Sequence, residues 1–303
     1  MLTDRTRPAR IRYAGTRIRL TEGQAHLLPA AAVADEMTAA RFSVLSPGTE
    51  RRHLRATYGP DGSRDAGYMT FGGDMAAGWR LAAAPHGAAF DASAEGVLVA
   101  PPGTRAQAAA VARFQQLAVL GLDRLPGLAG LDEVVLVGSG PVALGCALEL
   151  YRRGATRVRV LTSRPDPLIG RVPGVECVAA VAQGSASVVV DAAGTPRRAA
   201  DLLTKGGVLG LLGTPDPVSQ LSALDLHRAG WTVVGMHELV AGPACYQDAY
   251  TTAAAWLTWH LDPSLVNGWC RIVPGEAAPA VYGALDGRGR PTEPVVIFSW
   301  EVP

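Results

Sequence analysis

Residues 133–145, EVVLVGSGPVALG, decide the fold of this chain. The run opens as a buried strand, Gly138 and Gly140 follow it directly, and a helical pattern starts at Pro141. With Ala143 as the third small residue, the spacing matches the G-x-G-x-x-G/A turn, whose glycines permit a tight turn close to a pyrophosphate. The following helix would present free N–H groups and the positive end of its dipole. The stretch predicts a dinucleotide-binding turn; a Gly-rich turn in a non-binding α/β domain is the alternative.

The next strand along the chain, RVRVLTSR at residues 157–164, ends in the residues that select the nucleotide. An NAD site usually places Asp or Glu about 20 residues after the turn, to bind the ribose 2′-OH. Here Thr162, Ser163 and Arg164 stand at that place, and a hydroxyl beside a guanidinium suits a 2′-phosphate. We therefore predict NADPH as the cofactor. In the alternative interpretation Arg164 is a solvated surface residue and Asp166 takes the acidic role.

Three further apolar runs follow, ASVVVDAAG (186–194), GGVLGLLG (206–213) and WTVVGMHEL (231–239). Near-continuous apolar strands that alternate with helices are typical of a parallel sheet covered on both faces. This part of the chain is therefore predicted to be an α/β, doubly wound parallel sheet.

The first hundred residues have a different texture, with short alternating strands between Gly and Pro. A helix free of Gly and Pro starts at Ala106, and the end of the chain predicts one more helix and a last strand. We therefore predict a small, mostly β domain over residues 1–108. The strand candidates in it are ARIRYAG (9–15), RIRLTEG (17–23), GYMTFGGDMAAGWRLAAAPHG (67–87) and AEGVLVAPPG (94–103).

Composition narrows the class of protein. The 303 residues suffice for two domains, and 28 basic against 27 acidic residues leave a net charge of +1, which favours neither nucleic acid nor membrane as a partner. No long apolar run and no secretory signal pattern is present. Cys146, Cys177, Cys245 and Cys270 stand far apart, which argues against a disulfide framework or a cysteine zinc site. We expect a cytoplasmic protein.

Five segments in order and spacing resemble the medium-chain dehydrogenase/reductase superfamily, the zinc alcohol dehydrogenase-like proteins. They are SVLSPGTE, VLVGSGPVALG, VVVDAAGTP, GGVLGLLGTP and LHRAGWTVVGMHE. The resemblance implies a GroES-like β domain, residues 1–108 completed by 270–303, and a Rossmann domain with its linking helix at 109–269. Cofactor and substrate would lie in the cleft between the two domains.

The resemblance also extends the cofactor site to the turns after two later strands, whose alternative interpretation is ordinary turn punctuation. Ligands bind at the carboxyl ends of parallel strands, so both interpretations can hold together. The predicted cofactor-binding residues are Gly138, Ser139, Gly140, Pro141, Val142, Thr162, Ser163, Arg164, Gly194, Thr195, Gly213 and Thr214.

The chain departs from the family at the metal. Ser46 stands where the zinc enzymes carry a Cys, residues 71–74 read FGGD in place of their GHE motif, and Arg113 falls roughly at the third ligand position. The four-cysteine lobe of those enzymes is also missing. Because a catalytic zinc needs three protein ligands, we predict that no metal is bound and place the chain in a zinc-lacking branch.

Without a Lewis acid, the reacting oxygen needs hydrogen-bond donors or a cation as charge develops. Thr49 matches the hydroxyl that starts the proton relay in the family, and Arg113 is predicted to replace the charge of the metal. Tyr68 and Glu50 are candidates for proton delivery, with His53 weaker because of its spacing. Arg113 paired with an acid, and Glu50 as a structural anchor in a loop, are the alternatives. Predicted substrate contacts are Ser46, Gln115 and Gln116.

We therefore expect a zinc-independent, NADPH-dependent reductase that transfers hydride to a conjugated C=C or a carbonyl of a small organic molecule. A specialised-metabolite pathway, including reductive cyclisation, fits the resemblance and the composition. One alternative is a zinc-lacking secondary-alcohol dehydrogenase of the bacteriochlorophyllide dehydrogenase-like type. Another is a non-catalytic NADPH-binding sensor or scaffold. Family analogy further implies a homodimer joined through WTVVGMHEL.

Overall fold

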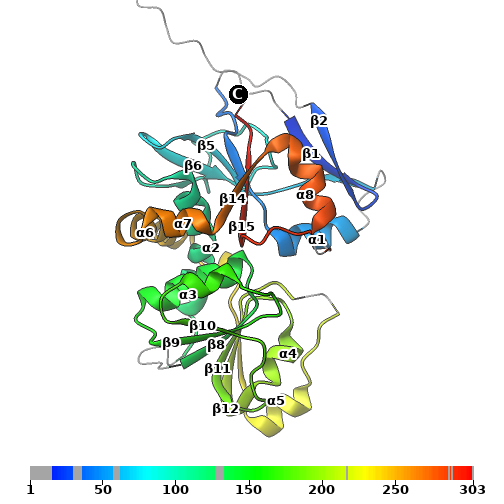
Figure 1. The fold of residues 1–303 in the computed structure, drawn as a ribbon, viewed down its shortest axis with the longest axis vertical. Coiled ribbons are helices and arrows are strands. Elements are labelled where there is room, and N and C mark those ends of the chain that lie inside the picture. The colour runs from blue at the N-terminus through cyan, green and yellow to red at the C-terminus, as the bar shows by residue number, and fades with distance from the viewer. Residues whose placement is uncertain are drawn as a thin grey trace, which may run out of the picture.

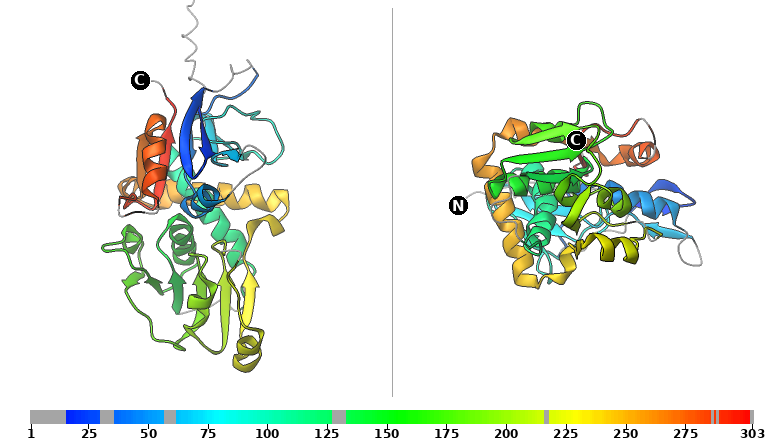
Figure 2. Two further views of the ribbon diagram at one scale, coloured as in Figure 1. Left: turned by 90° about the vertical axis from the view of Figure 1, so that its right-hand side faces the viewer. Right: turned by 90° about the horizontal axis from the view of Figure 1, so that it is seen from below.

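A computed structural model describes residues 16–29, 36–56, 62–126, 133–215, 218–285, 287 and 289–301. The predicted strand at 9–15 lies outside these residues. The chain forms two lobes stacked along its long axis, one built on a parallel sheet and the other on two further sheets (Figures 1 and 2). None of the helices in the described ranges combines the length and the hydropathy needed to span a bilayer.

The parallel sheet has six strands in the order β10-β9-β8-β11-β12-β13, and each neighbouring pair is parallel. Two halves wind outward from the centre in this order, which is the doubly wound Rossmann topology. The predicted α/β sheet is confirmed. Its strands are β8 (Glu133–Val137), β9 (Arg157–Leu161), β10 (Val175–Val178), β11 (Ala186–Asp191), β12 (Leu203–Leu211) and β13 (Thr232–Gly235).

Helices cover both faces of this sheet, and alternate residues of β8 divide between them. Val134 and Leu136 pack in the core that contains α2 (Ala106–Leu122) and α3 (Pro141–Arg152). Val135 and Val137 belong to the core on the opposite face, with α4 (Pro196–Ala200); α5 (Ala223–Ala229) contacts β12. Burial on both faces explains why β8 is apolar at successive positions.

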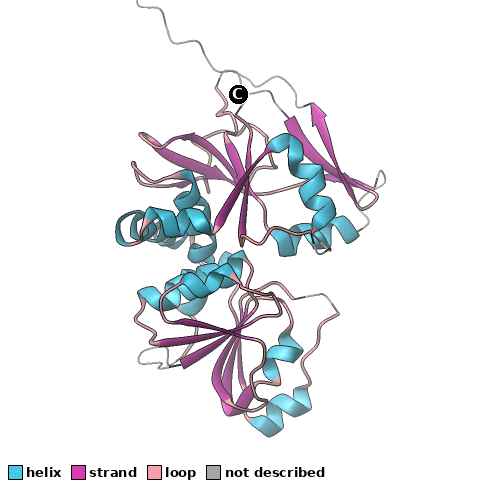
Figure 3. Cartoon of the chain, in the orientation of Figure 1, coloured by secondary structure: helices cyan, strands magenta, loops and turns pink. Residues whose placement is uncertain are grey.

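The second lobe holds a mixed sheet in the order β14-β15-β3-β5-β6-β7 and a three-stranded sheet in the order β2-β1-β4 (Figure 3). The last strand pairs antiparallel with β3, so the end of the chain completes this lobe. The strands are β1 (Thr16–Thr21), β2 (Gln24–Pro29), β3 (Phe42–Val44), β4 (Ser63–Asp65), β5 (Thr70–Asp74), β6 (Gly78–Ala82), β7 (Leu98–Val99), β14 (Cys270–Pro274) and β15 (Val295–Ser299).

The helix expected near the end of the chain is present as α6 (Pro243–His260), whereas helix α1 (Pro47–Arg55) was not anticipated from the sequence. The SPGTE segment, which holds the Glu50 considered above as an anchor in a loop, starts helix α1, because Pro47 suits the first helical position. Helix α6 contacts α2, and its Gln247 makes hydrogen bonds with the main chain of Val99 on β7. Helix α6 thus lies beside the second lobe (Figure 1). The remaining helical elements are α7 (Pro263–Gly268), α8 (Ala278–Ala284), η1 (Leu168–Arg171), η2 (Glu238–Val240) and η3 (Gly275–Ala277).

Candidate nucleotide-binding site

The turn after β8 has the geometry that a bound pyrophosphate requires. Gly138 has φ +108°, and a Cβ there would lie 3.1 Å from the Cβ of Ala193 on the neighbouring turn. Gly140 forms the N-cap of α3 without a side-chain cap, and a Cβ added to it meets no atom within 4 Å. The first-turn N–H groups of α3 are therefore open to a ligand, and Pro141 has none to satisfy.

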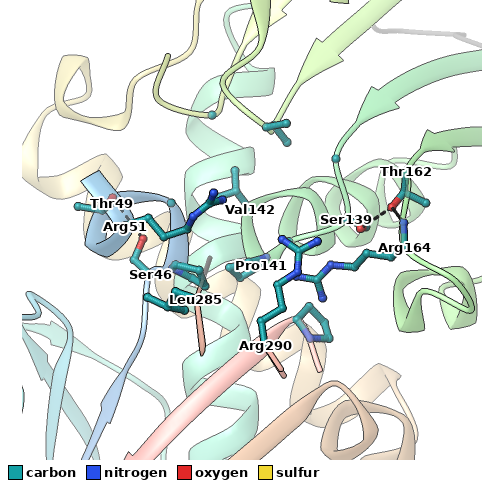
Figure 4. A pocket seen from close by; sticks show the side chains of 18 of the residues that line it. Ser46, Thr49, Arg51, Ser139, Pro141, Val142, Thr162, Arg164, Leu285 and Arg290 are labelled. Atoms are coloured by element: carbon teal, nitrogen blue, oxygen red, sulfur yellow. Dashed lines mark hydrogen bonds between the residues drawn. The ribbon is translucent and has the colours of Figure 1, made fainter. Parts of the chain in front are cut away.

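A groove with a volume of about 290 Å³ lies over this turn, between the two lobes. Helix α1, the carboxyl ends of four strands of the parallel sheet and the segment before β15 form its walls (Figure 4). Gly194 is the single predicted cofactor residue that does not line it. The predicted residues that do are Gly138, Ser139, Gly140, Pro141, Val142, Thr162, Ser163, Arg164, Thr195, Gly213 and Thr214.

The end of β9 carries a cluster of positive charge in the groove. Thr162 Oγ1 lies 2.7 Å from Ser139 Oγ and accepts a hydrogen bond from the main-chain N–H of Arg164 at 3.1 Å, which fixes the turn. The Arg164 side chain extends along the groove beside Arg290 (Figure 4). Burial and the charge of Arg290 lower the pKa of Arg164. No carboxylate in the described part of the chain forms an ion pair with either arginine, so this end of the groove attracts anions.

The alternative candidate for this role, Asp166, is exposed and does not line the groove. The groove as a whole is basic. Glu293 is the single acidic side chain among the described residues that line it, so these residues carry a net charge of +4. The arginines that line it are Arg51, Arg52, Arg164, Arg198 and Arg290.

Two of the predicted catalytic and substrate residues lie in the groove. Ser46, the N-cap of α1, and Thr49 in its first turn line it, and the Ser46 hydroxyl donates to Thr49 Oγ1 at 3.3 Å (Figure 4). Arg52, on the same helix, donates to the main-chain carbonyl of Pro215 at 3.3 Å, beyond β12. The helix that carries the two hydroxyls is therefore tied to the parallel-sheet lobe.

A second group of predicted residues lies at a buried ion pair. Arg113 on α2 donates to both carboxylate oxygens of Glu238, at 2.6 and 2.8 Å, and to Gln116 Oε1 at 2.7 Å. Its guanidinium lies over the ring of Tyr246, and Tyr68 is close enough to act on it electrostatically. Burial alone would lower the pKa of Arg113, but the Glu238 carboxylate raises it. Arg113 is thus paired with an acid, the alternative considered above, and its catalytic role stays a prediction.

Glu50 and Gln115 lie in internal networks and do not line the groove. Glu50 is fully buried and accepts a hydrogen bond from the Gly67 N–H at 3.1 Å. Burial raises the pKa of Glu50, but His53, 3.7 Å away, helps to bring it below its usual value. Gln115 donates to buried Glu149 at 3.2 Å. These contacts match the interpretation of Glu50 as a structural anchor, here in a helix.

The positions that matched zinc ligands hold no cluster of metal ligands. Among the described residues, no group of three His, Cys, Asp or Glu side chains could hold a metal ion. Ser46 lies in the groove, Arg113 is bound to Glu238, and Asp74 accepts a hydrogen bond from the N–H of Ala77.

Sequence reasoning missed four of the five groove arginines. Arg51 and Arg52 follow the SPGTE segment directly, and Arg198 follows the β11 turn. Arg290 lies in GRGRP, a run with no recognised spacing, 126 residues after Arg164. Proximity to a known motif could have indicated the first three, whereas Arg290 required the fold.

The chain resembles known proteins in its fold and not in its sequence. No family model and no curated protein matches the sequence of this chain. Its fold, in contrast, matches solved structures along almost its whole length. The chain has the fold of dehydrogenases and reductases.

Three of these structures illustrate the match. The quinone oxidoreductase from Thermus thermophilus, also solved with NADPH, is 21% identical, with a TM-score of 0.68 over 93% of this chain and 99% of that one. Alcohol dehydrogenase TADH from Thermus sp. ATN1 is 15% identical, with a TM-score of 0.71 over 94% and 99%. The yhdH oxidoreductase from Salmonella enterica, solved with NADP, is 14% identical, with a TM-score of 0.65 over 94% and 99%.

Proposed function

We propose that this protein is a zinc-independent, NADPH-dependent reductase that transfers hydride to a conjugated C=C or carbonyl of a small organic molecule. The observation that carries the cofactor assignment is the pair of Arg164 and Arg290 at the end of β9, with which no carboxylate in the described residues forms an ion pair. Like charges held side by side without a carboxylate are stabilised by a dianion between them.

The charge of the groove supports NADPH over NADH. Among the described residues, five arginines and one glutamate line it, which gives these side chains a net charge of +4. NADPH carries a charge of about −4 at neutral pH, because its 2′-phosphate adds nearly two charges to those of the pyrophosphate. NADH, which lacks the 2′-phosphate, carries only about half of that negative charge. Two neighbours in fold, the Thermus thermophilus quinone oxidoreductase and the Salmonella protein, were solved with NADPH and NADP, which supports the same assignment.

Residues of this chain would hold the nucleotide in a definite order along the groove. The open N-terminus of α3, behind Gly138 and Gly140, would bind the pyrophosphate, and Arg164 with Arg290 the 2′-phosphate. The turns after β11 and β12 would line the other end of the groove, opposite α1. NADPH, when bound, would supply the hydride. Side chains of the protein would orient the substrate and stabilise the charge on the reacting oxygen.

The hydroxyls on α1 are the donors best placed to serve the reacting oxygen. Thr49 lies in the groove and accepts from Ser46, so its own proton is free to point toward a ligand. A hydroxyl donor of this kind stabilises negative charge as it develops on oxygen. Ser46 and Arg113 occupy two of the metal-ligand positions suggested by the resemblance, and neither side chain is a zinc ligand. We therefore propose that hydrogen bonds, and not a metal ion, stabilise the negative charge that develops on the reacting oxygen.

A non-catalytic NADPH-binding sensor is the second candidate, and one observation favours it. Glu238 neutralises Arg113, the cation expected to serve the reacting oxygen. A protein that only binds NADPH and catalyses no reaction does not require an unpaired cation at the position of Arg113.

One set of measurements separates the candidates. NADPH and NADH binding is followed by fluorescence, and NADPH oxidation by absorbance with a panel of enones, quinones and ketones. We expect tight NADPH binding, weaker NADH binding and turnover on at least one compound. Thr49→Ala should lower turnover by roughly 100-fold, as for loss of one oxyanion donor, whereas Thr49→Ser should retain most of it. Preference for NADH would overturn the cofactor assignment, and tight NADPH binding without oxidation would favour the sensor.

We also propose that the protein acts in the cytoplasm as a homodimer. The β13 strand forms one edge of the parallel sheet, and an uncovered edge invites pairing with another chain. Size-exclusion chromatography with light scattering checks this, and a species of 31.5 kDa would overturn it.

A further inference from the structure

One acidic residue at the end of β11 holds two turns of the groove through both its side chain and its main chain. Asp191 is fully buried, and its Oδ1 accepts a hydrogen bond from the N–H of Ala193 at 3.0 Å. The amides of the next two residues also face this carboxylate. Its main-chain carbonyl accepts from the N–H groups of Leu212 and Gly213, at 3.0 and 2.7 Å. Asp191 thus links the turn at 192–195 to the turn at 212–215.

The two turns also interlock directly. Gly194 has φ +73°, and a Cβ added there would lie 2.3 Å from the carbonyl oxygen of Thr214. A Cβ at Gly213 would lie 2.5 Å from the carbonyl carbon of Ala192. Since neither glycine leaves room for a side chain, the turns pack backbone against backbone. Displacement of one turn must therefore displace the other.

Both turns face the groove, and the second also reaches the opposite lobe. Thr195 and Thr214 line the groove, while Asp191 itself does not. Pro215 accepts the hydrogen bond from Arg52 on α1, the helix that carries Thr49. A continuous chain of contacts therefore runs from Asp191, through the two turns, to the hydroxyl proposed to serve the reacting oxygen.

Burial of the Asp191 carboxylate is energetically unfavourable. Its Oδ2 is buried and makes no hydrogen bond of ordinary geometry with the described residues, although the Thr195 hydroxyl is close enough to lower the pKa of Asp191. Burial raises the pKa of Asp191 to about 6, although hydrogen bonds from the amides oppose the rise. A buried, half-satisfied carboxylate is destabilising, and such groups cluster at functional sites.

We propose that Asp191 is a positioning residue that fixes the two turns as one surface for the nucleotide without touching the nucleotide itself. This role in cofactor binding rests on the proposed function. The coupling of the two turns is a property of the free protein. The two statements can therefore be tested by separate readouts on the same variants.

The experiment compares Asp191→Ala, Asp191→Asn and, as a matched control, Val188→Ala in the full chain. Val188 is a buried apolar residue of the same strand, so its truncation lowers the Tm without touching either turn. NADPH affinity is measured by fluorescence, and amide exchange in residues 192–195 and 212–215 by mass spectrometry without nucleotide. We expect Asp191→Ala to raise the NADPH Kd by about tenfold, equal to roughly 1.4 kcal/mol, and to speed exchange in both turns. Asp191→Asn keeps an acceptor for the amides and should have smaller effects.

Unchanged exchange in the turn at 212–215 with Asp191→Ala would overturn the coupling, as would equal effects from Val188→Ala. Unchanged NADPH affinity with faster exchange in both turns would overturn the role in cofactor binding. Failure of the unaltered protein to bind NADPH would overturn the proposed function, while the exchange data would still decide the coupling. If Asp191→Ala does not fold, Asp191→Asn carries the same comparison.

Discussion

The guanidinium of Arg164, at the end of β9, donates hydrogen bonds to the main-chain carbonyls of Pro291 and Thr292 at 3.3 and 3.4 Å. The parallel-sheet lobe is thereby tied across the groove to the segment before β15. Both acceptors are neutral, and a phosphate oxygen forms a stronger, charge-assisted bond with the same donor. A phosphate that enters the groove would therefore replace the two carbonyls as the hydrogen-bond acceptor of Arg164.

The first prediction concerns this end of the groove. Arg164→Ala and Arg290→Ala should each weaken NADPH binding by roughly 10- to 100-fold, because each removes a charged contact of about 1.5–3 kcal/mol. NADH binding should change less than threefold, since it lacks the 2′-phosphate. Fluorescence titration with both nucleotides measures the ratio. Arg157→Ala, on the exposed start of β9, is the control and should alter neither affinity. Equal losses for NADPH and NADH would contradict the 2′-phosphate assignment.

The sequence located one side of this site and not the other. The glycine turn and Arg164 could both be recognised within residues 133–164, because a strand, turn and helix that are contiguous in the chain produce a local sequence pattern. Arg290 comes from the far end of the chain. It reaches the groove only because β15 pairs with β3 and returns the end of the chain to the second lobe. The spacing of residues near Arg290 in the sequence therefore could not predict that it lies in the groove.

A second prediction tests the buried ion pair. Arg113 and Glu238 have 9% and 14% of their side-chain surface exposed. Replacing one partner, by Arg113→Met or Glu238→Leu, should cost about 3–5 kcal/mol, because the other charge stays buried without a partner. The double variant should lose much less than the two single losses together. Urea unfolding of the four proteins measures this coupling.

The control for this cycle is the exposed pair of Arg157 and Glu176, with 57% and 55% exposure. Removal of either partner there should cost less than about 1 kcal/mol. If the single variants at Arg113 and Glu238 behaved like those of the exposed pair, the ion pair would not be a structural element, and Arg113 would be free to act on a substrate.

A third prediction concerns pH. His86 is fully buried, and its Nδ1 lies 2.8 Å from Ser43 Oγ, which accepts a hydrogen bond from Trp300. Burial lowers the pKa of His86 from 6.5 to about 4, although the charge of Glu50 opposes the shift. Between these values the unfolded chain binds a proton that the folded protein does not. The stabilisation is therefore complete above pH 6.5 and is lost as pH falls toward 4, in total about 3 kcal/mol.

His86→Asn removes this titration. Urea unfolding at pH 7.5 and 4.5 should show a smaller loss of stability with acid in the variant than in the unaltered protein, even if the variant is less stable at both values. Exposed His26, replaced by Asn, is the control for the loss of a histidine at the surface, and comparison of the two variants isolates the effect of burial at His86. An identical acid loss in His86→Asn and the unaltered protein would exclude His86 as its source.

The pairing of Arg113 with Glu238 and the burial of His86 show what local pattern leaves out. The sequence predicted helix α2 and the strand that became β13, but the distant partners of Arg113, Glu238 and Tyr246, come from η2 and α6, more than a hundred residues later. Whether a polar side chain is buried and paired is decided by tertiary packing, so the sequence left both roles of Arg113 open. The strands of the parallel sheet were predictable because burial on both faces acts on every residue of the strand itself.

The last prediction concerns the approach of the two helices that support the nucleotide turn. Gly145 lies in α3, and a Cβ added there would lie 2.3 Å from the main-chain carbonyl of Phe114 on α2. Helix propensity favours Ala over Gly by about 1 kcal/mol. The added methyl would nevertheless force two packed backbones apart, so Gly145→Ala should destabilise the protein by about 3 kcal/mol. Gly283, in α8, is the matched control, because a Cβ there meets no atom within 4 Å, and Gly283→Ala should stabilise by about 0.5–1 kcal/mol. Thermal unfolding of both variants compares the two effects, and a Gly145→Ala protein as stable as the unaltered one would mean that α2 and α3 do not pack this closely.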